Sequence, residues 1–338
     1  MKKFAWPLLA ALLFTLSSPA LADPLKLGRN QGGTQTLPVL AINEKYFEKQ
    51  GLDVELVMFL GTSDGINALN AGKIDVGLSF GTGSPLTFAA EGAPIVIIAG
   101  NLAGGHPIIT KPENAAKYKS VKDFKGKVVG TPRLYTADVV FRGAVFRAGL
   151  VPGRDFELIE FRRTIDVLEA VKSGKIDVGI GSSSITAGAL EAGLAIPLWS
   201  NDLFAYHPCC RIITTREVLK AKRPELVKLI KGLLLAERKF DQDPEAGVKA
   251  NMENMQIDEN LSRTLTLDPH IQLAVDPNTK GVLTMWDYMK ESKYITSTAD
   301  PRSFIDTSLY QEALAELRKE EPNEPFWAEM ETRFKDWN

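Results

Sequence analysis

The chain carries its two cysteines side by side, at Cys209 and Cys210, just after His207. Thiols and imidazoles bind soft metal ions and act as nucleophiles, so this stretch is the most chemically suggestive one. A vicinal disulfide would be strained, because adjacent Cα atoms lie about 3.8 Å apart and bridged cysteines usually lie about 4.4–6.8 Å apart. A metal site lacks a fourth ligand nearby in the sequence. We therefore prefer cysteines that pack as small apolar residues, and both alternatives stay open.

Four segments rich in glycine, hydroxyl and amide groups each precede a helical pattern. A helix that begins there directs free backbone N–H groups and the positive end of its dipole at whatever lies in front of it. One such segment is weak support, because Ser, Thr and Gly cap ordinary helices, but four equivalent ones suit a polar or anionic small molecule. The candidate ligand-binding residues in these segments are Gln31, Gly33, Thr34, Gly81, Thr82, Gly83, Ser84, Arg133, Tyr135, Thr136, Ser182, Ser183 and Ser184.

The hexamer GKIDVG occurs at 72–77 and again at 174–179. With the same offset of 102 residues and no gaps, 51–77 aligns with 153–179, and 14 of the 27 pairs are identical. One structural unit is therefore built twice. In each hexamer the glycine caps a helix and Ile-x-Val enters a buried strand, which indicates a structural role. We interpret Asp75 and Asp177 as capping or turn residues rather than catalytic groups.

Each copy of the unit alternates strands with helices, which predicts a parallel sheet in each. The strands are expected at 25–28, 54–59 and 74–78, and at 127–129, 156–161 and 176–180. The helices are expected at 37–48, 65–71, 139–148 and 165–172. Outside the repeat we expect a crossover at 111–126, a return strand at 206–214, a helix at 224–240, and a loop at 301–306 before a final helix at 309–319.

Open parallel sheets bind ligands beyond the carboxyl ends of their strands, so two such sheets predict a cleft between lobes. Arg133 could pair with an anion there, and Tyr135 could stack on a planar ligand. His106 follows an apolar strand and is expected to line the cleft. The stretch around the cysteines lies where the chain returns to the first lobe, so His207, Tyr206 or Arg211 could touch the ligand at its mouth.

The first 22 residues have the layout of a secretory signal peptide: Lys2 and Lys3, an apolar run, and Ala20-Leu21-Ala22 before Asp23. The chain has 338 residues, 44% hydrophobic and 24% charged, as expected for roughly two globular domains. Removal of the two lysines changes the formal net charge from −2 to about −4, which argues against a nucleic-acid partner. We expect an exported, soluble monomer.

No G-x-S-x-G, HExxH, P-loop or CxxC pattern occurs, and the three histidines are scattered. We therefore predict no enzymatic activity, no catalytic residues, no metal and no cofactor.

Several segments together resemble the periplasmic substrate-binding proteins of ABC importers, in the sulfonate, nitrate and thiamine-precursor (NMT1/THI5-like) group. They are EKYFEKQGLDVEL (44–56), LNAGKIDVGLSFGTGSPLTFAAEGAPIVIIAG (69–100), SVKDFKGKVVGTP (120–132), AVKSGKIDVGIG (170–181) and ITTREVLKAKRPELVKLIKGLLLA (213–236).

The resemblance implies an α/β, two-lobed, type II-like periplasmic binding protein fold, each lobe a mostly parallel sheet flanked by helices. It places lobe 1 at 23–112 plus 210–338 and lobe 2 at 113–209. It also implies capture of a small solute by hinged closure in the periplasm, and delivery to an inner-membrane permease with its ATPase.

Family members that bind sulfonates tend to carry a Trp-Asp-Pro-like stretch where this chain has Ser182–Ser184. A pyrimidine precursor or an aromatic acid is therefore as plausible as a sulfonate. The alternatives are a THI5-like pyrimidine-synthesis enzyme and a solute sensor for a membrane receptor.

Overall fold

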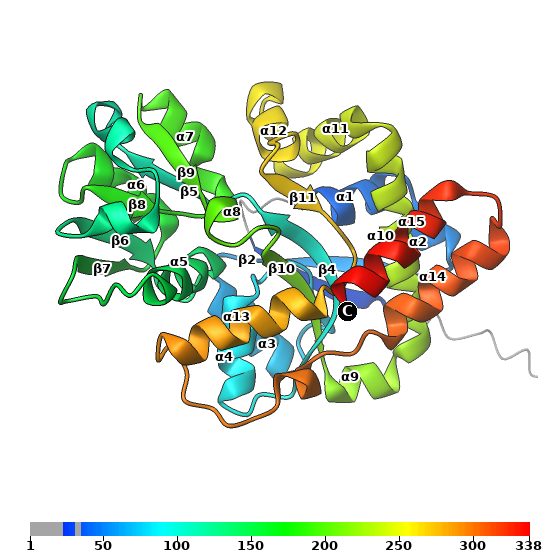
Figure 1. The fold of residues 1–338 in the computed structure, drawn as a ribbon. Coiled ribbons are helices and arrows are strands. Elements are labelled where there is room, and N and C mark those ends of the chain that lie inside the picture. Colours follow the sequence, from blue (N-terminus) through cyan, green and yellow to red (C-terminus); the bar gives the residue numbers. More distant parts are fainter. Residues whose placement is uncertain (1–22, 31–34) are drawn as a thin grey trace, which may run out of the picture.

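A computed structural model of the chain describes residues 23–30 and 35–338. These residues form two sheets, each flanked by helices, with the ends of the sheets facing each other (Figure 1). We call the elements packed on the first sheet lobe 1 and those packed on the second sheet lobe 2. The predicted signal peptide, Gln31, Gly33 and Thr34 lie outside the described residues.

Among the described residues, the first sheet has the strand order β11-β4-β10-β3-β1-β2 and the second has β7-β6-β8-β5-β9. The strands are β1 (Leu25–Asn30), β2 (Val54–Phe59), β3 (Val76–Gly77), β4 (Ile95–Gly104), β5 (Pro107–Thr110), β6 (Val128–Pro132), β7 (Glu157–Phe161), β8 (Val178–Ile180), β9 (Ala195–Trp199), β10 (Pro208–Thr215) and β11 (Ile271–Leu273).

The helices fill the connections and the C-terminal third. They are α1 (Thr36–Asn43), α2 (Tyr46–Lys49), α3 (Thr62–Asn70), α4 (Gly83–Ala90), α5 (Thr136–Arg147), α6 (Thr164–Lys172), α7 (Thr186–Glu191), α8 (Ser200–Leu203), α9 (Arg216–Ala221), α10 (Arg223–Gln242), α11 (Pro244–Met255), α12 (Glu259–Thr266), α13 (Thr279–Glu291), α14 (Ser308–Glu320) and α15 (Pro325–Trp337). Short 3-10 turns are η1 (Pro112–Lys117), η2 (Val121–Phe124), η3 (Ser183–Ile185) and η4 (Pro301–Phe304).

The duplicated unit recurs in the structure with the same pairing in both lobes. β1 pairs in parallel with β2 and β3, and β6 pairs in parallel with β7 and β8. The Asp75 carboxylate accepts the Lys26 amide at 2.9 Å, and the Asp177 carboxylate accepts the equivalent Val128 amide at 2.8 Å. The structural role predicted for both aspartates is confirmed: each fixes the start of the first strand of its unit.

β10 and β11 in the first sheet and β5 in the second run antiparallel to this parallel core, so both sheets are mixed. β4 and β9 have the direction of the core strands but pair with it only through the antiparallel strands β10 and β5. The helix expected at 37–48 is interrupted, because Lys45 has a left-handed φ of 57° between α1 and α2. The helix expected to be the last, α14, is followed by α15.

The chain passes from the first sheet to the second before residue 112, where the sequence analysis places the end of the first segment of lobe 1. β5 pairs with β8 and β9 of the second sheet, so the change falls between Gly104 and Pro107. Gly104 and Gly105 both have positive φ, 71° and 84°, which lets the backbone turn sharply there. The return to the first sheet begins at Pro208, before the expected residue 210.

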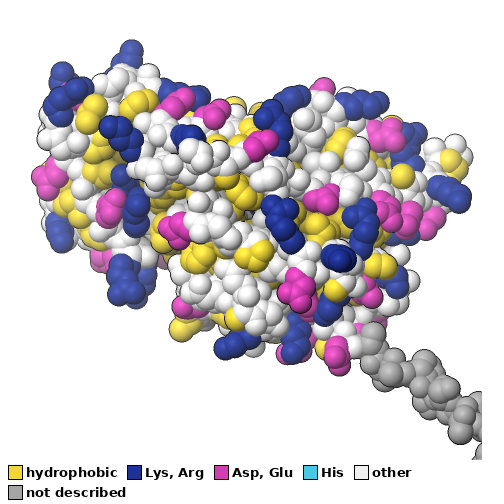
Figure 2. Space-filling view, turned by 90° about the horizontal axis from the view of Figure 1, so that it is seen from below, with side chains coloured by type: hydrophobic (Ala, Val, Ile, Leu, Met, Phe, Trp, Pro, Cys, Tyr) yellow, Lys and Arg dark blue, Asp and Glu magenta, His cyan; other side chains and the backbone are white. Residues whose placement is uncertain are grey.

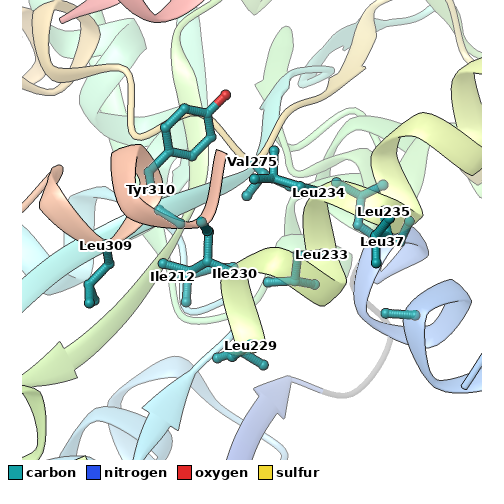
Figure 3. Packing of buried hydrophobic residues seen from close by; sticks show 14 of the residues in the cluster. Leu37, Ile212, Leu229, Ile230, Leu233, Leu234, Leu235, Val275, Leu309 and Tyr310 are labelled. Carbon is teal, nitrogen blue, oxygen red and sulfur yellow. The ribbon is translucent and has the colours of Figure 1, made fainter. Parts of the chain in front are cut away.

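The core of lobe 1 is built around α10, in which every residue from 229 to 237 is buried (Figure 3). Leu229, Ile230 and Leu233 of this helix lie in the same buried cluster as Ile212 of β10 and Leu309 of α14. The amphipathic pattern at 224–240 therefore positions the C-terminal helices against the first sheet.

A second buried cluster crosses between the lobes where α5 packs on α13 (Figure 1). Val139 and Val140 of α5 share this cluster with Trp286 and Met289 of α13. Gly143 is the point of closest approach, since a Cβ at this position would lie 1.8 Å from Cδ2 of Tyr288. The glycine lets the two helices approach without a collision.

Replacing Gly143 by alanine should therefore destabilise the protein by about 1–3 kcal/mol, as overpacking of a core does. Alanine otherwise favours a helix over glycine, so a loss of stability would have to come from the contact with Tyr288. The matched control is Gly188→Ala in α7, where the nearest atom, Cδ2 of Leu168, is 3.4 Å away. Urea unfolding of both variants measures the difference, and equal stability of the two would contradict the packing argument.

Candidate functional site

A cavity of about 160 Å³ lies between the lobes, where the carboxyl ends of the parallel strands meet. An engineered apolar cavity of about 150 Å³ binds benzene, so this one has room for a molecule with a single ring. Lobe 1, lobe 2 and their connection all contribute to its wall. The lining residues are Asn30, Gln35, Leu60, Thr62, Ser79, Phe80, Gly81, Ser84, Leu102, His106, Leu134, Tyr135, Thr136, Thr164, Ser182, Ser183, Ser184, Cys209 and Cys210.

The lobe 1 wall is a network of amides and hydroxyls. Asn30, the last residue of β1, donates from its side-chain amide to Thr62 at 2.9 Å. Gln35 donates to the Ser79 hydroxyl at 2.5 Å, while its side-chain oxygen is buried without a partner. The Asn30 side-chain oxygen is likewise buried and unpartnered. Two acceptor oxygens of cavity-lining residues are thus buried without a partner.

The lobe 2 wall also presents hydroxyl groups. Ser182 and Ser184 share a hydrogen bond of 2.7 Å between their hydroxyls, and the Ser182 amide donates to Thr164 at 2.9 Å. Thr164 begins α6, and Thr62, its counterpart 102 residues earlier, begins α3. Sequence reasoning missed both threonines, although the repeat offset that aligns them would have found the pair.

His106 is the most buried titratable group on the wall, at 3% exposure. Burial, with a smaller contribution from His207, lowers the pKa of His106 well below 6.5, so the ring is neutral. Neither ring nitrogen has a hydrogen-bond partner. A neutral imidazole offers one donor and one acceptor, so His106 can bind a polar group of a molecule in the cavity.

His207 was expected in the cleft but does not line the cavity. Its ring lies behind His106, with centroids 5.2 Å apart. Nδ1 lies 3.0 Å from the Phe204 carbonyl, and Nε2 lies 3.4 Å from the Ser200 hydroxyl. These contacts and the full burial of His207 fix its ring, which packs against the ring of His106.

Burial lowers the pKa of His207 to about 4, against 6.5 for an ordinary histidine. The unfolded chain therefore takes up a proton at a higher pH than the folded one. Stability is fully present above pH 6.5 and falls as the pH drops toward 4, by about 3 kcal/mol from this group. Urea unfolding at pH 7 and pH 4.5 should show a smaller loss for His207→Gln than for the unmodified chain. An equal loss in both proteins would contradict the assignment.

Four hydrogen bonds tie the lobes together beside the cavity, one of them from the Gly83 amide to the Thr136 hydroxyl at 3.4 Å. The Thr136 hydroxyl accepts the Thr82 amide at 2.9 Å and lies 2.9 Å from the Cys209 carbonyl, to which it donates. The Ser84 hydroxyl donates to the Leu134 carbonyl at 2.6 Å. Thr82 and Gly83 were expected to bind a ligand, but they lie beneath the wall and serve this junction instead.

Arg133 was expected to pair with an anion in the cleft, but it does not line the cavity. Its guanidinium lies 3.9 Å from the centre of the Tyr294 ring and within 4 Å of the Asp138 and Glu160 carboxylates. Arg211 does not line the cavity either, and its guanidinium donates to the backbone carbonyls of residues 102, 276 and 277. These cations already have partners on the protein.

Both cysteines are free thiols on the cavity wall. Cys209 is 4% exposed, Cys210 is half-buried, and their sulfur atoms lie 3.5 Å apart. The register of β10 against β4 shifts on both sides of Cys210. This bulge places neighbouring side chains on one side of the strand, which the sequence does not reveal.

The electrostatic character of the cavity is neutral and polar. The lining residues that the structure describes include no Lys, Arg, Asp or Glu, and the imidazole of His106 is neutral. α3, α5 and α6 nevertheless begin at the lining residues Thr62, Thr136 and Thr164, so the positive ends of their helix dipoles lie at the cavity. Outside the cavity, Figure 2 shows basic and acidic side chains interspersed over one face.

Within the described residues, no three His, Cys, Asp or Glu side chains come together in a way that could hold a metal ion. The same part of the chain has no helix both long and apolar enough to span a membrane.

Solved periplasmic binding proteins share this arrangement of two lobes. The aliphatic sulphonate binding protein SsuA of Escherichia coli superposes with a TM-score of 0.70 at 20% identity, covering 85% of this chain and 92% of that one. The nitrate-binding protein NrtA of Synechocystis PCC 6803 gives a TM-score of 0.72 at 16% identity, covering 87% and 89%. The chain therefore has the periplasmic binding protein fold, with two mixed α/β lobes.

Sequence relatives extend over most of the chain. A Brucella abortus (strain 2308) protein, provisionally named a binding protein, is 27% identical over 319 residues, which is 90% of this chain and 97% of the relative. A 4-amino-5-hydroxymethyl-2-methylpyrimidine phosphate synthase of Saccharomyces cerevisiae is 27% identical over 241 residues, 67% of this chain and 68% of the enzyme. The family model described as NMT1/THI5 like matches residues 34–246, more than half of the chain, and the protein therefore belongs to the NMT1/THI5-like family.

Proposed function

We propose that this protein is the periplasmic solute-binding component of an ABC importer. It holds one small polar organic molecule in the cavity between its lobes and closes on it by a hinge motion. The observation that carries the proposal is His106: a buried, neutral, unpartnered imidazole on the wall of a cavity to which both lobes contribute. The hydroxyls of Ser182, Ser183 and Ser184 and the amide of Gln35 would complete the hydrogen bonds of the solute.

The wall favours a neutral or weakly acidic ring compound over a sulfonate. An unpaired charge is expensive to bury, and the described lining offers no cation to a permanent anion. Donors and acceptors are both abundant, and Tyr135 and Phe80 supply flat apolar surface. A pyrimidine precursor has this mixture of groups without a charge, and the helix N-termini would favour its electronegative atoms.

Residues 1–22 would direct export and be removed near Ala22. The mature protein would act as a monomer that presents the closed form to a permease with its ATPase in the inner membrane. In this proposal lobe 1, including the C-terminal helices, and lobe 2 are the two bodies that move, and the crossings near residues 105 and 207 are the hinge.

The proposal is tested by native mass spectrometry of the purified protein, followed by a thermal-shift screen with pyrimidines, aromatic acids, sulfonates and inorganic oxyanions. We expect one molecule bound per chain, released unchanged on unfolding, and the largest shifts among neutral ring compounds. Preferential binding of sulfonates would refute the assignment of solute class, and no reversible binding at all would refute the solute-binding function.

The similarity to the yeast synthase supports a second candidate, an enzyme of pyrimidine synthesis. Incubation with the bound compound separates the two. A binding protein returns the compound unchanged after many hours, whereas its chemical conversion would establish the enzyme.

A further inference from the structure

Cys209 and Cys210 form a pair of thiols that the proposed solute binding does not use. They are consecutive residues of β10, both line the cavity, and their sulfur atoms lie 3.5 Å apart. The bulge in β10 is what allows adjacent side chains to share one side of the strand. The pair therefore faces the same enclosed space as the ring-sized cavity.

The separation of the sulfur atoms does not suit a direct bond between them. A disulfide requires about 2.05 Å between sulfurs, and consecutive Cα atoms lie closer than bridged cysteines normally do. Bond formation would also shift the peptide at Cys209, whose carbonyl accepts the Thr136 hydroxyl at 2.9 Å and the Thr82 hydroxyl at 3.2 Å. The contacts between the lobes oppose that movement.

The same separation does suit one atom that bridges both sulfurs. With bonds of about 2.3 Å, typical of thiolate ligation, sulfurs 3.5 Å apart subtend roughly 100° at the bridging atom. A linear two-coordinate ion would need sulfurs about 4.6 Å apart. The described residues supply no cluster of three ligands that could hold a metal ion, so the bridging atom has to bring its own third substituent. A bent, soft, three-coordinate centre with one organic group meets these conditions.

We propose that Cys209 and Cys210 are a binding site for monosubstituted trivalent arsenicals, with arsenic bridging the two sulfurs and its organic group in the cavity. An aryl group fits the volume of about 160 Å³. Soft thiolate ligands select soft centres of this kind. The site uses the cavity wall but does not depend on which solute the protein carries, or on whether it carries one.

The chemistry is a condensation without a change of oxidation state. An arsonous acid R–As(OH)₂ loses two hydroxide groups, two As–S bonds form, and the two thiol protons leave with the hydroxides as two waters. Cys210 reacts first, since the contact with the Cys209 thiol lowers the pKa of Cys210, and Cys210 is the more exposed of the two. Cys209, whose pKa is raised by the same contact and by burial, closes the ring in the second step.

Phenylarsine oxide and the purified, reduced protein provide the test. Intact-mass analysis should show one arsenical per chain, retained in excess glutathione and released by a dithiol such as dithiothreitol. Cys209→Ser and Cys210→Ser should each weaken binding by about 100-fold or more, because a second thiol on the same site acts at a high effective concentration. In the unmodified chain, the arsenical should protect both cysteines from alkylation, which requires no variant to fold.

Three results would overturn the site. They are no adduct with the reduced protein, equal binding by the single-serine variants and the unmodified chain, and a Cys209–Cys210 disulfide that forms in place of the adduct. Failure of the solute screen with a normal arsenical adduct would refute only the importer function. A bound solute with no adduct would refute only the dithiol site.

Discussion

Replacing His106 by leucine should weaken binding of the solute by about tenfold to a hundredfold. Leucine keeps an apolar side chain of similar bulk in the wall but removes both hydrogen-bonding nitrogens. The polar group of the solute that faces His106 would then be buried without a partner, which costs about 1–3 kcal/mol. Isothermal titration calorimetry with the solute identified by mass spectrometry measures the loss.

The matched variant is His106→Gln, whose amide keeps one donor and one acceptor in place of the two ring nitrogens. It should retain more affinity than His106→Leu. Because the imidazole is already neutral when buried, the amide changes no charge at pH 7. If glutamine and leucine reduced affinity equally, His106 would be a packing residue, and the hydrogen-bonding role assigned to it would be wrong.

Replacing Thr136 by valine should reduce solute affinity by about tenfold to a hundredfold and also lower the stability of the unliganded protein. The Thr136 hydroxyl joins the Thr82 amide of lobe 1 to lobe 2, and the side chain is 4% exposed. Valine has the same shape but leaves this amide donor unpaired whenever the lobes are closed, a penalty of about 1–3 kcal/mol. In the open form water can hydrate the Thr82 amide, so Thr136→Val destabilises the closed form more than the open form.

The chain offers a control for this substitution in Thr186. It is also 4% exposed, and its hydroxyl is buried without a hydrogen-bond partner. Thr186→Val should therefore be neutral or stabilising in urea unfolding and leave solute affinity unchanged. If both valine variants lost affinity to the same extent, loss of the contact between the lobes could not be the cause.

Most of the fold could be predicted from the hydrophobic periodicity of the sequence and from its internal repeat. The offset of 102 residues located the parallel strands of both lobes, and glycine at 72 and 174 marked two helix ends at which φ is 67° and 75°. These features are local: helix caps and strand alternation depend on neighbours along the chain. The mixed pairing of the sheets was harder to foresee, because β4, β5 and β10 obtain their partners from distant segments.

For the cavity, the sequence by itself determined which loops meet, because the carboxyl ends of parallel strands share an edge. It placed Gly81, Ser84, His106, Tyr135, Thr136 and Ser182–Ser184 on the wall, where the structure has them.

Only the tertiary structure decided which side chains in those loops are free to meet a solute. Arg133 is held by two carboxylates and an aromatic ring from other elements, and Thr82 is held by Thr136. Cys209 and Cys210 face the cavity together because of a bulge in a strand whose partner lies about a hundred residues away. The direction and hydrogen-bonding state of a side chain depend on such distant contacts, which no local pattern encodes.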